Sequence, residues 1–196
     1  MSKVVIIKYN AGNVQSVIYA LNRLGIEPLL TDIPEEIQRA DKVIFPGVGE
    51  AGTAMQYLAE RKLDKLIREL TQPFLGICLG LQLMCEHSEE GNTTCLGVFP
   101  LKVKKFPDQN KVPQIGWNTL YDLRSPIFKN VAEYSHVYFV HSYYAECMDE
   151  FTISKTTYSL EYSSSIKKNN FYAVQFHPEK SSDVGSRIIE NFLKYT

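Results

Sequence analysis

Apolar runs and helical patterns alternate through the first half of the chain. Short apolar runs occupy residues 3–8, 26–30, 42–47 and 74–78. The first of them, KVVIIK, suits a strand that is buried on both faces. Apolar residues then recur at helical spacing as far as Gly25, and a second helical pattern covers residues 54–70. Strands with intervening helices predict a parallel sheet that is covered by helices on both faces.

The second half of the chain has a different composition. Residues 95–106, 136–144, 152–168 and 170–176 are rich in Val, Thr, Tyr and Phe, which favour strands. Their spacing predicts an antiparallel extension of the sheet rather than a second domain. Residues 181–195 have the pattern of a final helix. The sequence therefore predicts one α/β domain over residues 1–196, in three layers, with a mostly parallel central sheet, helices on both faces and an antiparallel extension.

Composition and charge exclude several classes of function. The 196 residues include 21 Lys and Arg against 22 Asp and Glu, a net charge of −1, so we expect no binding of nucleic acid or of an anionic membrane. No apolar run approaches the roughly 18 residues of a membrane span or the apolar region of a signal peptide, which favours the cytoplasm. The cysteines form no C-x-x-C pair, which predicts free thiols and no metal site: Cys78, Cys85, Cys95 and Cys147.

One of these cysteines lies at a predicted junction between a strand and a helix. Cys78 follows the apolar run FLGI, has a glycine two residues away on each side, and precedes a helix-like pattern. Such a turn resembles a nucleophile elbow with Cys in place of Ser. The N–H of Leu79 would then point toward an oxyanion on the attacked carbonyl. An inert core cysteine is the alternative interpretation, because Cys is often buried as a small hydrophobe.

Candidate partners for this thiol lie near the end of the chain, in AVQFHPEKS. His177 and Glu179 are two residues apart, so in an extended segment their side chains point to the same side. The carboxylate would fix the tautomer of the ring, and the ring would activate the thiol. A surface loop that contains His and Glu by chance is the alternative.

A third segment, FPGVGEAG at residues 45–52, is a glycine-rich loop between a predicted strand and a helix. Its exposed N–H groups could bind a phosphate or an oxyanion. No Lys-Ser/Thr pair of the phosphate-binding type follows it. We therefore favour an oxyanion donor, the N–H of Val48 or Gly49.

Together the motifs PGVG (46–49), GICLGLQ (76–82) and HPE (177–179) resemble the class I glutamine amidotransferases over nearly the whole chain. The segments AGNVQSV (11–17), PQIGWN (113–118), HSYY (141–144) and Lys180 are similar to the branch that supplies the glutaminase subunit of imidazole glycerol phosphate synthase in histidine biosynthesis. The resemblance implies hydrolysis of L-glutamine to glutamate and ammonia by a Cys78–His177–Glu179 triad, through a thioester and without a cofactor.

The same resemblance implies roles for residues outside the triad. Positions that match the family's glutamine site are Gly49, Gln82, Ser142 and Tyr143. The ammonia would pass to a (β/α)8-barrel synthase, or cyclase, as the partner in a heterodimer. The positions that match the side facing this partner are Asn13, Trp117, Asn118 and Lys180.

Two departures from the family pattern bear on these roles. Many relatives have an acidic residue and glycine where this chain has Lys8 and Asn10, which concerns partner contacts rather than the triad. Leu81 replaces the His of many other amidotransferases, which favours the histidine branch. The alternatives are a glutaminase of another branch, a Cys-dependent peptidase or deglycase on a related fold, and a non-catalytic partner module.

Overall fold

The computed structural model describes residues 3–9 and 14–196. Its helices are α1 (Gln15–Arg23), α2 (Pro34–Gln38), α3 (Ala51–Glu60), α4 (Leu63–Glu69), α5 (Leu79–Met84) and α6 (Ser182–Tyr195), with 3-10 turns η1 (Glu90–Asn92), η2 (Pro126–Phe128) and η3 (Pro178–Lys180). Its strands are β1 (Val4–Ile7), β2 (Leu29–Thr31), β3 (Lys42–Phe45), β4 (Phe74–Ile77), β5 (His87–Ser88), β6 (Thr93–Thr94), β7 (Lys102–Lys105), β8 (Gln114–Thr119), β9 (His136–His141), β10 (Tyr143–Ala145), β11 (Thr152–Tyr158), β12 (Leu160–Lys168) and β13 (Phe171–Val174).

Most of the strands of the described residues belong to one sheet, in the order β2-β1-β3-β4-β13-β12-β10-β7-β5-β6, with β11 paired to β12. The pairs from β2 to β13 are parallel, and the pairs of β13 with β12 and of β12 with β10 and β11 are antiparallel. A separate antiparallel pair, β8 and β9, lies beside this extension. The mostly parallel sheet and its antiparallel extension are therefore confirmed.

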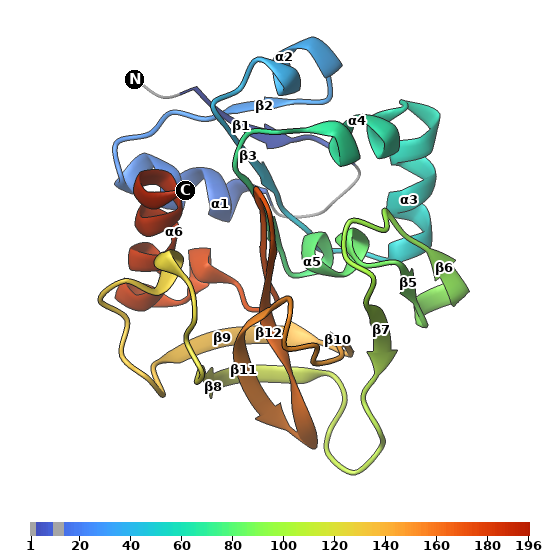
Figure 1. Ribbon diagram of the computed structural model, residues 1–196, viewed down its shortest axis with the longest axis vertical. Coiled ribbons are helices and arrows are strands. Elements are labelled where there is room, and N and C mark those ends of the chain that lie inside the picture. Colours follow the sequence, from blue (N-terminus) through green and yellow to red (C-terminus); the bar gives the residue numbers. More distant parts are fainter. Residues whose placement is uncertain (1–2, 10–13) are drawn as a thin grey trace.

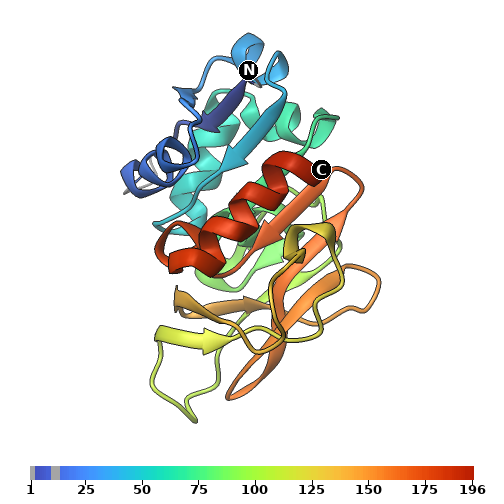
Figure 2. The ribbon, with the colours of Figure 1, turned by 90° about the vertical axis from the view of Figure 1, so that its left-hand side faces the viewer.

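Helices cover both faces of the parallel half (Figure 1). Figure 1 shows α1 and α6 on one side of the sheet and α3 and α4 on the other, and Figure 2 looks onto the side that carries α1 and α6. In β1 the buried side chains alternate between two core clusters, Val4 and Ile6 in one and Val5 and Ile7 in the other. Because these strands are buried on both faces, they appear in the sequence as continuous apolar runs. The predicted three-layer fold is confirmed.

One helical segment differs from the prediction, and a short helix joins it. The pattern over residues 54–70 forms two helices, α3 and α4, because Lys62 takes a left-handed conformation with φ of 59° and interrupts the helix. Apolar spacing continues across this break, so periodicity alone does not reveal it. Pro34 opens the short helix α2, whose buried side is Ile37 alone.

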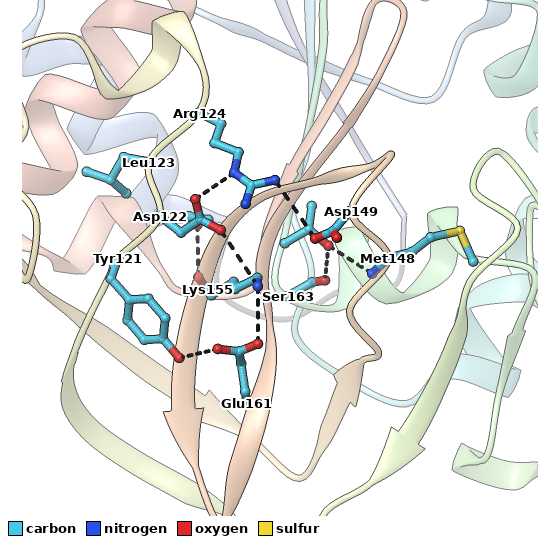
Figure 3. A network of polar contacts seen from close by, with 12 residues as sticks. Tyr121, Asp122, Leu123, Arg124, Met148, Asp149, Lys155, Glu161 and Ser163 are labelled. Atoms are coloured by element: carbon cyan, nitrogen blue, oxygen red, sulfur yellow. Dashed lines mark hydrogen bonds and ion pairs between the residues drawn. The ribbon is translucent and has the colours of Figure 1, made fainter.

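Charged side chains fasten the segment after β8 to the β11–β12 hairpin (Figure 3). Lys155 of β11 lies between Asp122 and Glu161, with N···O distances of 3.7 and 3.2 Å. Arg124 contacts Asp122 at 2.6 Å, and the hydroxyl of Tyr121 donates to Glu161. Backbone hydrogen bonds between Tyr121 and Lys155 join the same two segments. This cluster fixes the end of β8 on the main sheet, next to β9, whose last residues line the cavity described below.

Candidate active site

Cys78 lies on a sharp turn between β4 and α5. Its backbone has φ of 54° and ψ of −109°, a region that L-residues rarely adopt. The turn is anchored on β13, because the N–H of Cys78 donates to the carbonyl of Val174 at 2.8 Å. The residue is 6% exposed, at the carboxyl end of a central strand. This is the geometry of a nucleophile elbow, which holds a side chain above the edge of a sheet.

Parallel pairing of β4 with β13 brings the predicted partners to the same edge. Ile77 pairs with Val174, so Cys78 and His177 both follow the ends of adjacent strands. His177 and Cys78 line the same cavity, and the thiol lies close enough to the ring to raise the pKa of His177. Nδ1 of the ring is hydrogen-bonded to Oε1 of Glu179 at 2.7 Å. Because Nδ1 faces the carboxylate, Nε2 is the ring nitrogen that remains for the sulfur. The structure thus brings together three side chains that sequence analysis selected from two widely separated segments.

The environment of His177 favours the imidazolium form. The side chains of His177 and Glu179 are each 4% exposed. Burial by itself lowers the pKa of His177, but the hydrogen bonds and charges of Cys78 and Glu179 outweigh it and raise the pKa to about 10. A cationic ring at neutral pH stabilises a thiolate beside it and holds a proton ready for a leaving group.

A cavity of about 320 Å³ opens in front of the thiol. This volume lies at the small end of ligand sites and suits a molecule the size of an amino acid. Apart from Glu179, which lies behind His177, every residue predicted for the triad, the oxyanion site and the glutamine site lines it. The lining residues are Val48, Gly49, Cys78, Leu79, Gln82, Glu90, Pro113, Val140, His141, Ser142, Tyr143, His177 and Lys180.

The expected oxyanion donors are only partly available in this conformation. The N–H of Leu79 donates a long hydrogen bond, 3.4 Å, to the carbonyl of Gly47. An oxyanion could accept from Leu79 only after the Gly47–Val48 peptide has turned away. Gly49 has φ of 131°, a backbone conformation that L side chains rarely adopt, and a Cβ at this position would meet nothing within 4 Å. The oxyanion role of Leu79, Val48 and Gly49 stays a prediction.

Two glycines let the site elements pack closely. A Cβ at Gly80 in α5 would overlap the carbonyl oxygen of Phe45 at the end of β3, and a Cβ at Gly185 in α6 would overlap the carbonyl of Pro178. The first contact sets the helix start after Cys78, and the second holds the turn that carries Glu179 against α6. The glycine of GICLG at position 80 therefore serves helix-to-strand packing.

The residues expected to face a partner have different environments. The ring of Trp117 on β8 is 54% exposed, and Ile115, two residues earlier on the same face, is 60% exposed. Lys180 is exposed at the cavity mouth. The amide of Asn118 is bonded within the chain, to the Thr157 carbonyl and the Thr119 N–H. Asn13 and Asn10 lie outside the described residues.

Two residues of the site were not found from the sequence. Glu90 lines the cavity, accepts from the N–H of Ala51 at 2.8 Å, and has its pKa raised by burial. Nothing in the acidic pair at positions 89 and 90 distinguishes it. Gln175, fully buried, reaches the Cys78 sulfur. It lies in the bend between β13 and η3, where no regular periodicity marks it.

The described residues contain no group of three or more His, Cys, Asp or Glu side chains that could hold a metal ion. Among the same residues, no helix is both long enough and apolar enough to cross a membrane. The site that the structure does contain is a thiol, an imidazole and a carboxylate beside a small cavity, an arrangement suited to acyl transfer through a covalent intermediate.

Comparison with known proteins decides which acyl-transfer family this is. The family model of class I glutamine amidotransferases matches residues 5–195. The chain belongs to the class I glutamine amidotransferase family. The predicted family is therefore confirmed, and this favours amide hydrolysis over the peptidase and deglycase alternatives.

Relatives within this family are similar over their full length. The chain is 55% identical to the imidazole glycerol phosphate synthase subunit HisH of Bacteroides fragilis strain YCH46, over 98% of this chain and 99% of that protein. It is 44% identical to the protein of the same name from Idiomarina loihiensis, over 98% of each chain.

Solved structures of amidotransferases share the fold. One that is described as a glutamine amidotransferase has a TM-score of 0.76 at 20% identity, with 97% of both chains covered. The structure of PurLQS from Thermotoga maritima has a TM-score of 0.75 at 15% identity, with 100% of this chain and 99% of that chain covered. At these identities the likeness concerns the fold alone.

Proposed function

We propose that this amidotransferase is the glutaminase subunit of an imidazole glycerol phosphate synthase, and that Cys78, His177 and Glu179 carry the hydrolysis of L-glutamine. The observation that carries the residue assignment is the buried contact of His177 with both Cys78 and Glu179. The branch follows from the 55% identity to a HisH subunit over nearly the full length of both chains.

The first half of the reaction forms a thioester. The Cys78 thiolate attacks the side-chain carboxamide carbon of glutamine, and the carbonyl electrons move onto oxygen. His177, as imidazolium, gives its proton to the amide nitrogen, so that the C–N bond breaks and ammonia leaves. The second half reverses these roles: neutral His177 takes a proton from water, hydroxide adds to the thioester carbon, and Cys78 leaves as the thiolate with glutamate as the product. Glu179 keeps the ring oriented in both halves.

Substrate binding uses the cavity walls. The α-ammonium group of glutamine carries a positive charge, and Glu90 is the acidic side chain among the cavity-lining residues. Gln82, Ser142 and Tyr143 line the same space and hold the rest of the molecule, as the family resemblance implies. Full activity requires the Gly47 carbonyl to leave the Leu79 N–H, and we assign this rearrangement to the docked partner.

The partner is a (β/α)8-barrel cyclase subunit that covers the cavity mouth. Support comes from the exposed apolar pair Trp117 and Ile115, and from Lys180 at the cavity mouth. Ammonia must reach the second active site unprotonated, because ammonium has no lone pair with which to attack. A complex that encloses the mouth meets this requirement, and we place it in the cytoplasm with the rest of such a biosynthetic pathway.

A glutaminase assay tests the proposal. The chain is mixed with the cyclase and the cyclase's own substrate, and glutamate is measured with and without the partner. We expect strong activation by the partner and no hydrolysis by the Cys78→Ala variant in the same complex. Unchanged hydrolysis by Cys78→Ala would refute the residue assignment. Hydrolysis that is indifferent to the cyclase would refute the choice of branch.

A further inference from the structure

A buried amide lies against the sulfur of Cys78. Gln175 follows β13 and is 0% exposed, and its backbone N–H is held by the carbonyl of Ser164 at 2.8 Å. Its side-chain Nε2 lies 3.6 Å from the Cys78 sulfur, within hydrogen-bonding distance for sulfur. Its Oε1 lies 3.1 Å from Nε2 of Gln82, a residue that lines the cavity. Gln175 thus links the thiol to the wall of the substrate cavity.

The direction of these hydrogen bonds is fixed by a backbone carbonyl. Nε2 of Gln82 lies 3.1 Å from the carbonyl of Tyr143, which can only accept. The amide nitrogen of Gln82 must therefore face that carbonyl, and its second N–H is directed to Gln175 Oε1. Since Oε1 of Gln175 accepts from Gln82, the opposite end that faces Cys78 is the donor. The series of hydrogen bonds from Tyr143 through Gln82 to Gln175 therefore ends in an N–H group that faces the Cys78 sulfur.

Such a donor stabilises the thiolate over the thiol. The sulfur also lies 3.7 Å from the carbonyl of Val140, to which only a protonated thiol can donate. Ionisation removes that interaction, while the N–H of Gln175 gains strength because its acceptor becomes charged.

We propose that Gln175 is a positioning residue that holds the Cys78 sulfur in its attacking geometry, stabilises its thiolate, and couples it to the substrate-facing Gln82. The inference rests on the proposed function in one respect, the role of Cys78 as nucleophile. It gives the thiolate a hydrogen-bond donor in addition to His177. It also makes the position of the Cys78 sulfur depend on the position of Gln82 in the glutamine site.

The test is the pH dependence of Cys78 alkylation by iodoacetamide, without glutamine. Other titratable groups near the site are Tyr9, Tyr162, His141, His177, Glu179, Glu90 and Lys180. Burial raises the pKa of Tyr9 and Tyr162 and lowers that of His141 to about 4, so these three stay neutral across the working range. Measurements use a Cys147→Ser background, because Cys147 is exposed, and follow the peptide that contains Cys78 by mass.

Two variants separate the parts of the proposal. Gln175→Met fills the space and removes both the donor and the acceptor, and Gln175→Glu keeps an acceptor for Gln82 but turns a carboxylate toward sulfur. Each variant loses the hydrogen bond from Gln175 to the Cys78 thiolate. The midpoint of the alkylation profile should therefore rise by about one pH unit in Gln175→Met and by more in Gln175→Glu. The KM for glutamine should rise in Met alone, because only there does Gln82 lose its acceptor, whereas kcat falls in both.

Gln72→Met is the matched control, since Gln72, in the loop before β4, donates to the carbonyl of Ile37 in α2 and should leave the profile unchanged. Thermal unfolding verifies that each variant is folded, and Gln175→Glu serves alone if the Met variant does not fold. A midpoint within about 0.3 units of the parent in the folded variants would overturn the inference. Because alkylation needs no turnover, this result is separate from the fate of the glutaminase proposal, which depends on hydrolysis by Cys78→Ala.

Discussion

The Glu179→Gln substitution removes the negative charge behind His177 with little change in shape. The carboxylate accepts from Nδ1 at 2.7 Å, and both side chains are 4% exposed, so solvent screens this interaction weakly. A charged hydrogen bond contributes about 1.5–3 kcal/mol and a neutral one about 0.5–1.5 kcal/mol. The difference, about 1–1.5 kcal/mol, corresponds to roughly one pKa unit. The pKa of His177 should therefore fall from about 10 by about one unit.

The rate should fall by more than this shift alone implies. The loss is about tenfold if the Gln oxygen still accepts from Nδ1. If the amide turns its N–H to Nδ1, the ring carries its proton on Nε2 and cannot accept from sulfur, and the loss can approach the order of 10⁴-fold known for a buried carboxylate-to-amide change in a serine triad. We expect kcat to fall between these limits, while KM changes little.

The assay combines kinetics with direct titration of the ring. Glutamate production is measured in the complex with the cyclase, and the His177 ring is titrated by NMR in the isolated chain. Glu190→Gln, which changes a partly exposed carboxylate in α6 that accepts from Lys194, is the matched control and should leave both values unchanged. A variant at position 179 with parental kcat and an unshifted His177 pKa would refute the reasoning that Glu179 orients and charges the ring.

Four further predictions follow from the same contacts. Gly80→Ala should lower the free energy of unfolding in urea by about 1–3 kcal/mol, because the new methyl group overlaps the Phe45 carbonyl; an unchanged value would show that α5 shifts freely. Glu90→Gln should raise the KM for glutamine about tenfold, with a smaller change in kcat, if the carboxylate binds the α-ammonium group. Trp117→Ala should weaken cyclase binding about tenfold or more in calorimetry, whereas Tyr134→Ala, an exposed aromatic in the loop before β9, should not. The pKa of His177 is raised from 6.5 to about 10 on folding, so its contribution to stability is complete below pH 6.5 and is lost as the pH rises toward 10; the difference in unfolding free energy between the parent and His177→Gln should shrink over that range, and a constant difference would contradict it.

The parallel half of the fold was predictable because its strands are buried on both faces. Runs such as Val4–Ile7 can only be accommodated inside a covered sheet, and the helical spacing between them supplied the cover. The break at Lys62 and the insertion of β13 beside β4 were not predictable in the same way. The break is a single left-handed residue, Lys62, within a continuous apolar pattern. The pairing of β13 with β4 joins segments about a hundred residues apart in the sequence.

The site shows the same division between local and long-range information. Cys78, His177 and Glu179 were found because each lies in a short motif with a chemical rationale. The extended segment expected for His177 and Glu179 was wrong, because the 3-10 turn η3 brings the carboxylate to the ring, and Gln175 was missed because it lies in the bend between β13 and that turn. The occupied N–H of Leu79 depends on the orientation of one peptide at Gly47, which no residue pattern encodes.

The thioester itself offers the most direct measurement. The chain, bound to its cyclase, is mixed with L-glutamine, quenched in acid within its first turnovers, and digested for mass spectrometry. The account predicts that one γ-glutamyl group is attached to the peptide that contains Cys78, and that it disappears as glutamate accumulates. Glutamate production with no adduct on Cys78, or with the adduct on another residue, would contradict it.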